Sequence, residues 1–135
     1  MTAGYSGTPL AKKLSLKDDM RVWWDNVPRS VADEIAEEGL HLDLLQAPES
    51  PVDAAHIFVT SRSQLEIKLR DLLPLLAPAG MIWASWPKKA SKVPTDITED
   101  IIREVALPMH LVDVKVCSVD DIWSALKLVI RKEHR

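Results

Sequence analysis

Apolar residues along this chain gather in blocks whose spacing switches between that of strands and that of helices. Residues 54–60 form a nearly unbroken apolar run, which is typical of a parallel strand covered on both faces, and residues 81–86 form a second one. Between them, leucines within residues 65–76 repeat on one helical stripe, which Pro74 is expected to break or kink. The centre of the chain therefore predicts two buried strands joined by a helix.

Weaker patterns on either side of this centre predict the remaining elements. Thr8 before Pro9 signals a helix start, because threonine caps free amides and proline suits the first turn, and a short helix through about residue 14 is expected. The apolar positions of residues 30–39 recur at helical spacing up to Gly39, a residue suited to a left-handed helix end. The other elements are strands at residues 20–24, 40–45, 112–117 and 126–131, the last two as an antiparallel pair, and a helix capped by Thr98 that ends at Pro108.

Strands that alternate with helices in this way imply a mostly parallel sheet with helices on both faces. The predicted fold class is therefore α/β, a three-layer Rossmann-like sandwich with a six-stranded sheet. No internal repeat, low-complexity tract or linker interrupts the pattern. We expect one domain over residues 1–135.

Composition sharpens this picture and excludes several classes of function. The 135 residues are 47% hydrophobic and 27% charged, so a packed core is expected. With a single cysteine, Cys117, no disulfide forms within the chain, and no basic and apolar leader opens it, which favours the cytoplasm. No apolar run is long enough to cross a bilayer. A net charge of -3 gives no overall attraction to nucleic acid.

The second half of the chain resembles the late part of class I methyltransferases. Leu75 to Trp83 reads as a helix end, a Pro-Gly turn and a strand, and the closing strand pair is similar to theirs as well. This resemblance implies the sheet order 2-1-3-4-6-5, with the last strand antiparallel and inserted beside the fourth.

The chain more closely resembles a bacterial family catalogued only as a domain of unknown function. The motifs that carry this resemblance lie at residues 4–14, 59–62, 83–89, 95–100 and 113–117, so they extend over essentially the whole chain. The resemblance implies a protein of the bacterial cytosol with a Rossmann-like fold. It supplies no reaction.

The turn after the first strand lacks the glycines that a dinucleotide or S-adenosylmethionine site needs. Such glycines let the backbone approach the cofactor and present amides at the helix start. Residues 25–30 include Val27, which blocks close approach, and Pro28, which has no amide hydrogen, and no clear ribose-binding acid follows the second strand. We therefore predict no cofactor, while a nonstandard nucleotide site stays open as an alternative.

A ligand is nevertheless expected at the carboxyl ends of the strands, where the strand order reverses. The loops that converge there carry hydroxyl, amide and cationic side chains, which suit phosphate or carboxylate. The alternatives are that the lysines belong to a solvated loop and that the tryptophan is a core anchor. The predicted ligand-binding residues are Ser6, Thr8, Asn26, Thr60, Ser61, Arg62, Ser85, Trp86, Lys88 and Lys89.

Other reactive residue types have plainer explanations. His56 lies in a buried-type strand and is interpreted as a core histidine near the amino end of that strand. The remaining histidines lack metal-ligand spacing, so no metal site is predicted. Cys117 shares a strand face with Lys115, which would lower the pKa of its thiol, but it is assigned no nucleophilic role.

The sequence supports three hypotheses for function. The first is a non-catalytic domain that binds a small anionic ligand or a protein partner at the strand carboxyl edge. The second is a cryptic methyltransferase-like enzyme. The third is a structural subunit or homodimer that assembles through Trp123 and the C-terminal strand pair, because edge strands offer unpaired backbone groups. No catalytic residue is assigned, and neither nucleic acid nor membrane is expected as a partner.

Overall fold

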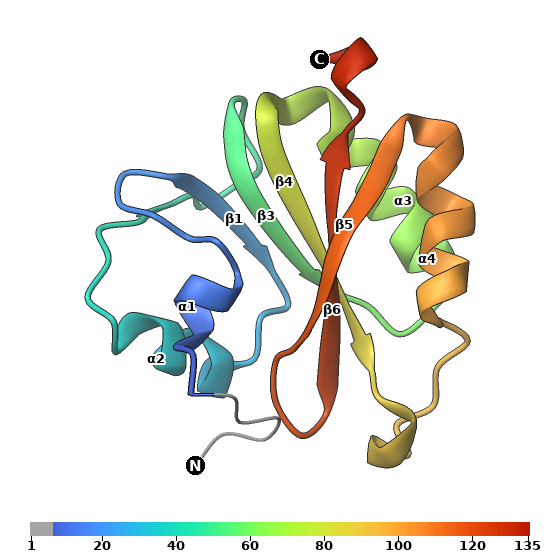
Figure 1. Cartoon of the computed structure of the whole chain (residues 1–135), viewed down its shortest axis with the longest axis horizontal. Helices are drawn as coiled ribbons and strands as arrows, with labels where there is room; N and C mark the ends of the chain where they lie inside the picture. The colour runs from blue at the N-terminus through green and yellow to red at the C-terminus, as the bar shows by residue number, and fades with distance from the viewer. Residues whose placement is uncertain (1–6) are drawn as a thin grey trace.

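The computed structural model describes residues 7–135, in which six strands form one sheet flanked by helices (Figure 1). Within these residues, only β6 runs antiparallel to its neighbours, in the order β2-β1-β3-β4-β6-β5. The predicted α/β fold class, strand order and antiparallel last strand are confirmed. The strands are β1 (Arg21–Asp25), β2 (Asp43–Leu44), β3 (Val52–Phe58), β4 (Leu76–Pro87), β5 (Leu111–Ser118) and β6 (Trp123–Ile130).

Helices cover both faces of the sheet, as the alternating pattern predicts. Helices α1 (Leu10–Lys13) and α2 (Arg29–Ala36) pack on one face, and α3 (Arg62–Leu72) and α4 (Glu99–Ala106) pack on the other. Within residues 7–135, no helix combines the length and the apolar content that crossing a membrane requires. Short 3-10 turns complete the chain: η1 (Leu73–Leu75), η2 (Lys89–Ser91), η3 (Leu107–Met109) and η4 (Lys132–His134).

Each face of the sheet has its own hydrophobic core, because successive residues of a strand point to opposite sides. In β3, Ala55 and Ile57 pack against α3 and α4, whereas Ala54 and Phe58 pack against α1 and α2. Burying a large aliphatic or aromatic side chain contributes about 1.5–3 kcal/mol. The two cores together fix β3 and β4 in the centre and so set the position of the loops that follow them.

Several local signals in the sequence appear as predicted. Thr98 caps α4 by accepting a hydrogen bond of 3.2 Å from the Ile101 amide. Ser61, predicted only as a ligand-binding residue, caps α3 in the same way, with a hydrogen bond of 3.3 Å from the Gln64 amide. α3 gives way to η1, a 3-10 turn with Pro74 in its first turn. Gly39 has a φ of 68°, the left-handed conformation expected after α2.

Two local predictions are wrong. Thr8 does not cap the first helix, because Pro9 itself takes the extended N-cap conformation and α1 starts at Leu10, one residue too late for the threonine. The Pro-Gly turn is not a turn either, since residues 77–80 belong to β4, where its register with β3 shifts. A Cβ at Gly80 would lie 2.8 Å from the carbonyl oxygen of Val52, so only glycine fits this close approach.

Candidate functional site

The strand order reverses between β1 and β3, at the carboxyl edge of the sheet. β2 lies on one side of β1, and the chain then crosses over to form β3 on the other side. In open α/β sheets the crevice at such a reversal is where ligands bind. The loops that follow β1, β3 and β4 lead to this edge, in the lower half of Figure 1.

The turn after β1 is tight because Asn26 adopts a left-handed backbone conformation, with a φ of 60°. Asparagine tolerates this conformation better than most residues that carry a Cβ. Its side chain is exposed, and α2 begins only three residues later, at Arg29, after Pro28. Asn26 therefore makes the turn that glycine makes in cofactor-binding loops, but it keeps a side chain there.

An ion pair lies at the end of β1. The Nζ atom of Lys68, on α3, is 2.8 Å from Oδ1 of Asp25, the last residue of β1. The two side chains are 21% and 25% exposed, so the pair is mostly buried at this edge of the sheet. Lys68 therefore neutralises the carboxylate that would otherwise repel an anion at this edge.

The amino end of α2 differs from those of α3 and α4. α3 is capped by Ser61, and Oδ1 of Asp96 accepts a hydrogen bond of 2.8 Å from the Arg62 amide. α4 is capped by Thr98 and has two acids in its first turn. α2, which starts at Arg29, has neither a side-chain cap nor an acid in its first turn, as far as the described residues extend. Its first amides and the positive end of its dipole are therefore uncompensated at the carboxyl edge of the sheet.

Three predicted residues follow β3 and are engaged in contacts of their own. The Thr60 amide donates to the side chain of Gln64, and Ser61 caps α3. The Arg62 guanidinium pairs with Glu66 at 3.1 Å and with Glu104 at 3.4 Å. These contacts tie the loop to α3 and α4. A role for the three residues in ligand binding stays a prediction.

Ser85 and Trp86, at the end of β4, are both buried. Ser85 is 0% exposed, and its Oγ shares a hydrogen bond of 2.7 Å with Nε2 of His56. Trp86 is 9% exposed and packs in the core on the α3 and α4 face, so the interpretation of Trp86 as a core anchor is confirmed. Neither side chain is presented at the surface of the edge where the sequence placed it, because β4 stays covered on both faces up to Pro87.

Lys88 and Lys89 follow β4 at the same edge of the sheet. The Lys88 ammonium donates a hydrogen bond of 2.6 Å to Oγ of Ser118, at the end of β5, and Lys89 is exposed. Thr8 is exposed just before α1. Ser6 lies outside the described residues. The hydrogen bond to Ser118 therefore holds Lys88 in place at the carboxyl edge.

The set of residues predicted from sequence did not include Asp25, Lys68 and Ser118. Asp25 had a usable signal, because it is the polar residue that ends an apolar strand at the reversing edge. Lys68 stands next to Leu69 and three residues after Leu65, at the border of the buried stripe of α3. A cation in that position can reach back over the sheet edge, but the spacing does not reveal its partner.

Two reactive residues differ from expectation in detail. His56 is a core histidine as predicted, but it is the fifth residue of β3 rather than near its amino end, and burial lowers its pKa to about 3. The expectation for Cys117 has the wrong sign, since burial raises the pKa of its thiol although Lys13, Lys115 and Lys88 act to lower it. In residues 7–135, no group of three or more histidine, cysteine or acidic side chains is placed to hold a metal ion.

No protein-family model and no curated protein sequence matches this chain. Several solved structures, in contrast, are similar to it. Fibrillarin from Aeropyrum pernix, in complex with natively bound S-adenosyl-L-methionine, is 15% identical with a TM-score of 0.53, over 93% of this chain and 70% of that one. Precorrin-6y C5,15-methyltransferase from Geobacter metallireducens is 12% identical with a TM-score of 0.57, over 90% of this chain and 85% of that one.

A third similar structure is not named as a methyltransferase. It is a protein in the NADB-Rossmann superfamily from Streptococcus agalactiae, 11% identical with a TM-score of 0.53, over 94% of this chain and 70% of that one. At such low identities the similarity bears on the fold alone. This chain has the class I methyltransferase-like Rossmann fold.

Proposed function

We propose that this chain binds a small anionic ligand at the crevice between β1 and β3, as a binding domain that does not catalyse methyl transfer. The observation that carries the proposal is the uncompensated amino end of α2, which begins at Arg29 directly after the turn at Asn26. Free amides and the helix dipole at such an end attract phosphate and carboxylate groups. The predicted cytoplasmic location and membership of an uncharacterised bacterial family stay part of this proposal.

Cationic side chains along the carboxyl edge of the sheet support an anion as the ligand. The side chain of Arg29, at the start of α2, is 94% exposed and its Nε lies 4.0 Å from Oδ2 of Asp33, and Lys68 neutralises Asp25 at 2.8 Å. Lys88 is held at the same edge through Ser118. Phosphate and carboxylate oxygens accept strong, charge-assisted hydrogen bonds from such groups. The ligand class is therefore a small molecule that carries phosphate or carboxylate.

The second candidate is an S-adenosylmethionine-dependent enzyme, and the comparisons favour it. The fibrillarin structure holds natively bound S-adenosyl-L-methionine, and the precorrin-6y protein is a methyltransferase. Against it stand Val27 and Pro28, which replace the glycines of a cofactor loop, and β2, which ends at Leu44 without an acid for a ribose. The two candidates differ in the ligand they require, so binding separates them.

Ser30→Asp tests the proposal by placing a carboxylate in the first turn of α2. The acid complements the helix dipole, so the folded protein is expected to keep or slightly raise its melting temperature. The same charge repels an anion at the crevice. In calorimetric titrations with inorganic pyrophosphate and with ATP, we expect the wild type to bind at least one probe and the variant to bind it about tenfold more weakly.

Ser50→Asp is the matched control, because it makes the same substitution at an exposed residue just before β3, at the amino edge of the sheet and opposite to the crevice. It is expected to keep the affinity of the wild type. Two results contradict the proposal: no heat from either phosphate probe, or equal loss in both variants. Heat from S-adenosylmethionine alone would favour the enzyme instead.

A further inference from the structure

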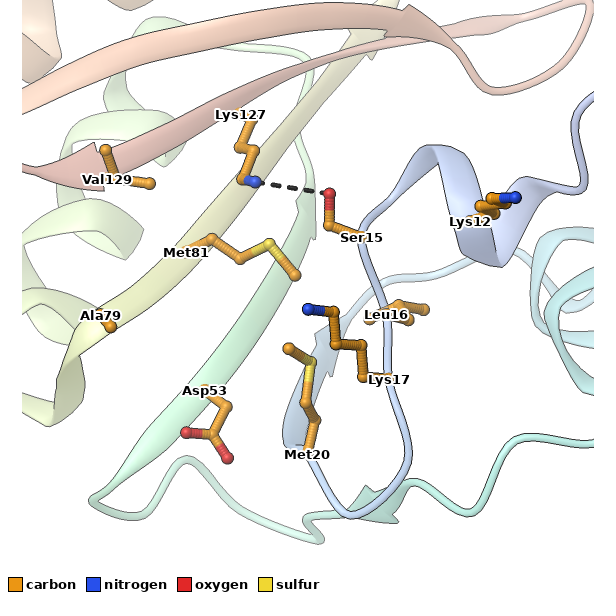
Figure 2. Close-up of a pocket in the computed structure, with 10 residues that line it drawn as sticks. All are labelled: Lys12, Ser15, Leu16, Lys17, Met20, Asp53, Ala79, Met81, Lys127 and Val129. Carbon is orange, nitrogen blue, oxygen red and sulfur yellow. Dashed lines mark hydrogen bonds between the residues drawn. The ribbon is translucent and has the colours of Figure 1, made fainter.

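A pocket of about 440 Å³ lies on the α1 face of the sheet, at the edge opposite to the crevice between β1 and β3. The segment after α1 and the amino ends of β3 and β4 form its walls, and Met20, Asp53 and Ala79 are among the residues that line it (Figure 2). Small-molecule sites typically have volumes of roughly 300–1,000 Å³. The pocket is therefore large enough for a small ligand and separate from the crevice.

Lysine side chains surround this pocket without acidic partners. Lys12, Lys17 and Lys127 line it, and Lys115 of β5, outside the lining, stands opposite Lys127 of β6 in the strand register. None of the four forms an ion pair within the part of the chain that the structure describes. Oδ2 of Asp53, the acid in the lining, accepts a hydrogen bond of 2.9 Å from the Arg21 amide. The pocket therefore carries an excess of positive charge.

Lys127 is the cation whose surroundings most favour an anion. It lies in the middle of β6, paired with Trp83 of β4, and its ammonium donates a long hydrogen bond of 3.4 Å to Oγ of Ser15 (Figure 2). Burial, followed by the charges of Lys115 and Lys17, lowers the pKa of Lys127. A half-buried cation beside like charges is stabilised when an anion enters its surroundings.

The rest of the lining is apolar. Met20 and Met81 point toward one another across the pocket, and Leu16, Ala79 and Val129 complete the apolar surface (Figure 2). Methionine side chains adapt to ligands of different shape. An inorganic ion would leave this surface in contact with water, and a neutral apolar molecule would leave the lysines unpaired.

We infer that this pocket binds an amphipathic anion, a small molecule with a carboxylate or phosphate head beside Lys17 and Lys127 and a short apolar body against Met20 and Met81. The inference does not depend on the function proposed above, because the pocket and the crevice lie at opposite edges of the sheet. The two sites also require different probes and different variants. Failure of one proposal is therefore distinguishable from failure of the other.

Calorimetric titration with octanoate tests this inference. The wild type is expected to bind octanoate. 1-Octanol lacks the carboxylate and inorganic phosphate lacks the apolar chain, so both are expected to bind at least about tenfold more weakly. The double variant Lys17→Gln with Lys127→Gln is expected to lose at least about tenfold in octanoate affinity. Urea unfolding of both proteins shows whether the variant is folded.

Arg70→Gln is the matched control, because it removes one exposed positive charge from α3, on the other face of the sheet. It is expected to bind octanoate like the wild type. The inference is overturned if the wild type does not bind octanoate, if 1-octanol or phosphate binds equally well, or if Arg70→Gln weakens binding as much as the double variant. Tighter binding of a single-stranded oligonucleotide than of octanoate would overturn it in favour of a nucleic-acid surface.

Discussion

Replacing Trp83 with alanine is expected to lower the free energy of unfolding by about 3–5 kcal/mol, the usual cost of emptying a buried aromatic site. Trp83 is 1% exposed in the centre of β4 and packs in the core beneath α1 and α2. Domains of this kind have a total stability of about 5–15 kcal/mol, so the loss is a large part of the whole. Urea unfolding followed by circular dichroism measures it.

Trp83→Phe separates packing from hydrogen bonding at the same position. The indole Nε1 donates a hydrogen bond of 2.9 Å to the carbonyl oxygen of Leu14, just after α1, and phenylalanine cannot replace it. An unpaired buried acceptor costs about 1–3 kcal/mol, so an intermediate loss of stability is expected. Amides of residues 10–16 should exchange faster in this variant. If both variants unfold at the urea concentration of the wild type, Trp83 does not hold α1 on the sheet.

The sequence predicts the centre of this fold well because β3 and β4 are covered on both faces. A strand in that position must be apolar throughout, and the runs around Ile57 and Ile82 leave few alternatives. The same reasoning fails at the start of β4, where Gly80 is read as part of a turn. A bulge that lets two backbones approach has the same local composition as a turn, so only tertiary context distinguishes them.

The candidate sites are less predictable, because they depend on contacts between distant positions. Asp25 and Lys68 are 43 residues apart, and Ser15 and Lys127 are 112 residues apart. Sequence spacing indicates which strand edge a loop reaches, but it does not indicate whether a side chain there is buried. Ser85 shows this limit, since it stands near the end of a strand and yet is fully covered and bonded to His56.

The lysines at and beside the pocket show the same limit, because a basic site formed by distant residues leaves no local signal in the sequence. Lys17 and Lys127, which line the pocket, and Lys115 beside them come from three separate segments, each with an ordinary local charge, and the net charge of -3 suggests no basic surface. The antiparallel pairing of β5 and β6 brings Lys115 opposite Lys127, and the loop after α1 adds Lys17. A local excess of positive charge can therefore exist in an acidic chain without any basic run in its sequence.

Acidification is expected to destabilise this protein through His56. Burial lowers the pKa of His56 to about 3, whereas the histidine of an unfolded chain titrates near 6.5. Between these values the unfolded chain binds a proton that the folded protein does not, so the free energy of unfolding falls as the pH falls from 6.5 towards 3. At about 1.4 kcal/mol per pH unit, the contribution of His56 lost between pH 6.5 and pH 4 is about 3 kcal/mol.

His56→Gln isolates this contribution from that of the other titrating groups. Glutamine does not titrate and keeps a side-chain amide for Ser85, whose Oγ lies 2.7 Å from the imidazole Nε2. Urea unfolding of both proteins at pH 7, 5.5 and 4 gives the difference directly. The wild type should lose about 3 kcal/mol more than the variant over this range, with most of the divergence below pH 6.5. Parallel losses in the two proteins would mean that the imidazole is protonated in the folded state, and the burial of His56 would then not control its charge.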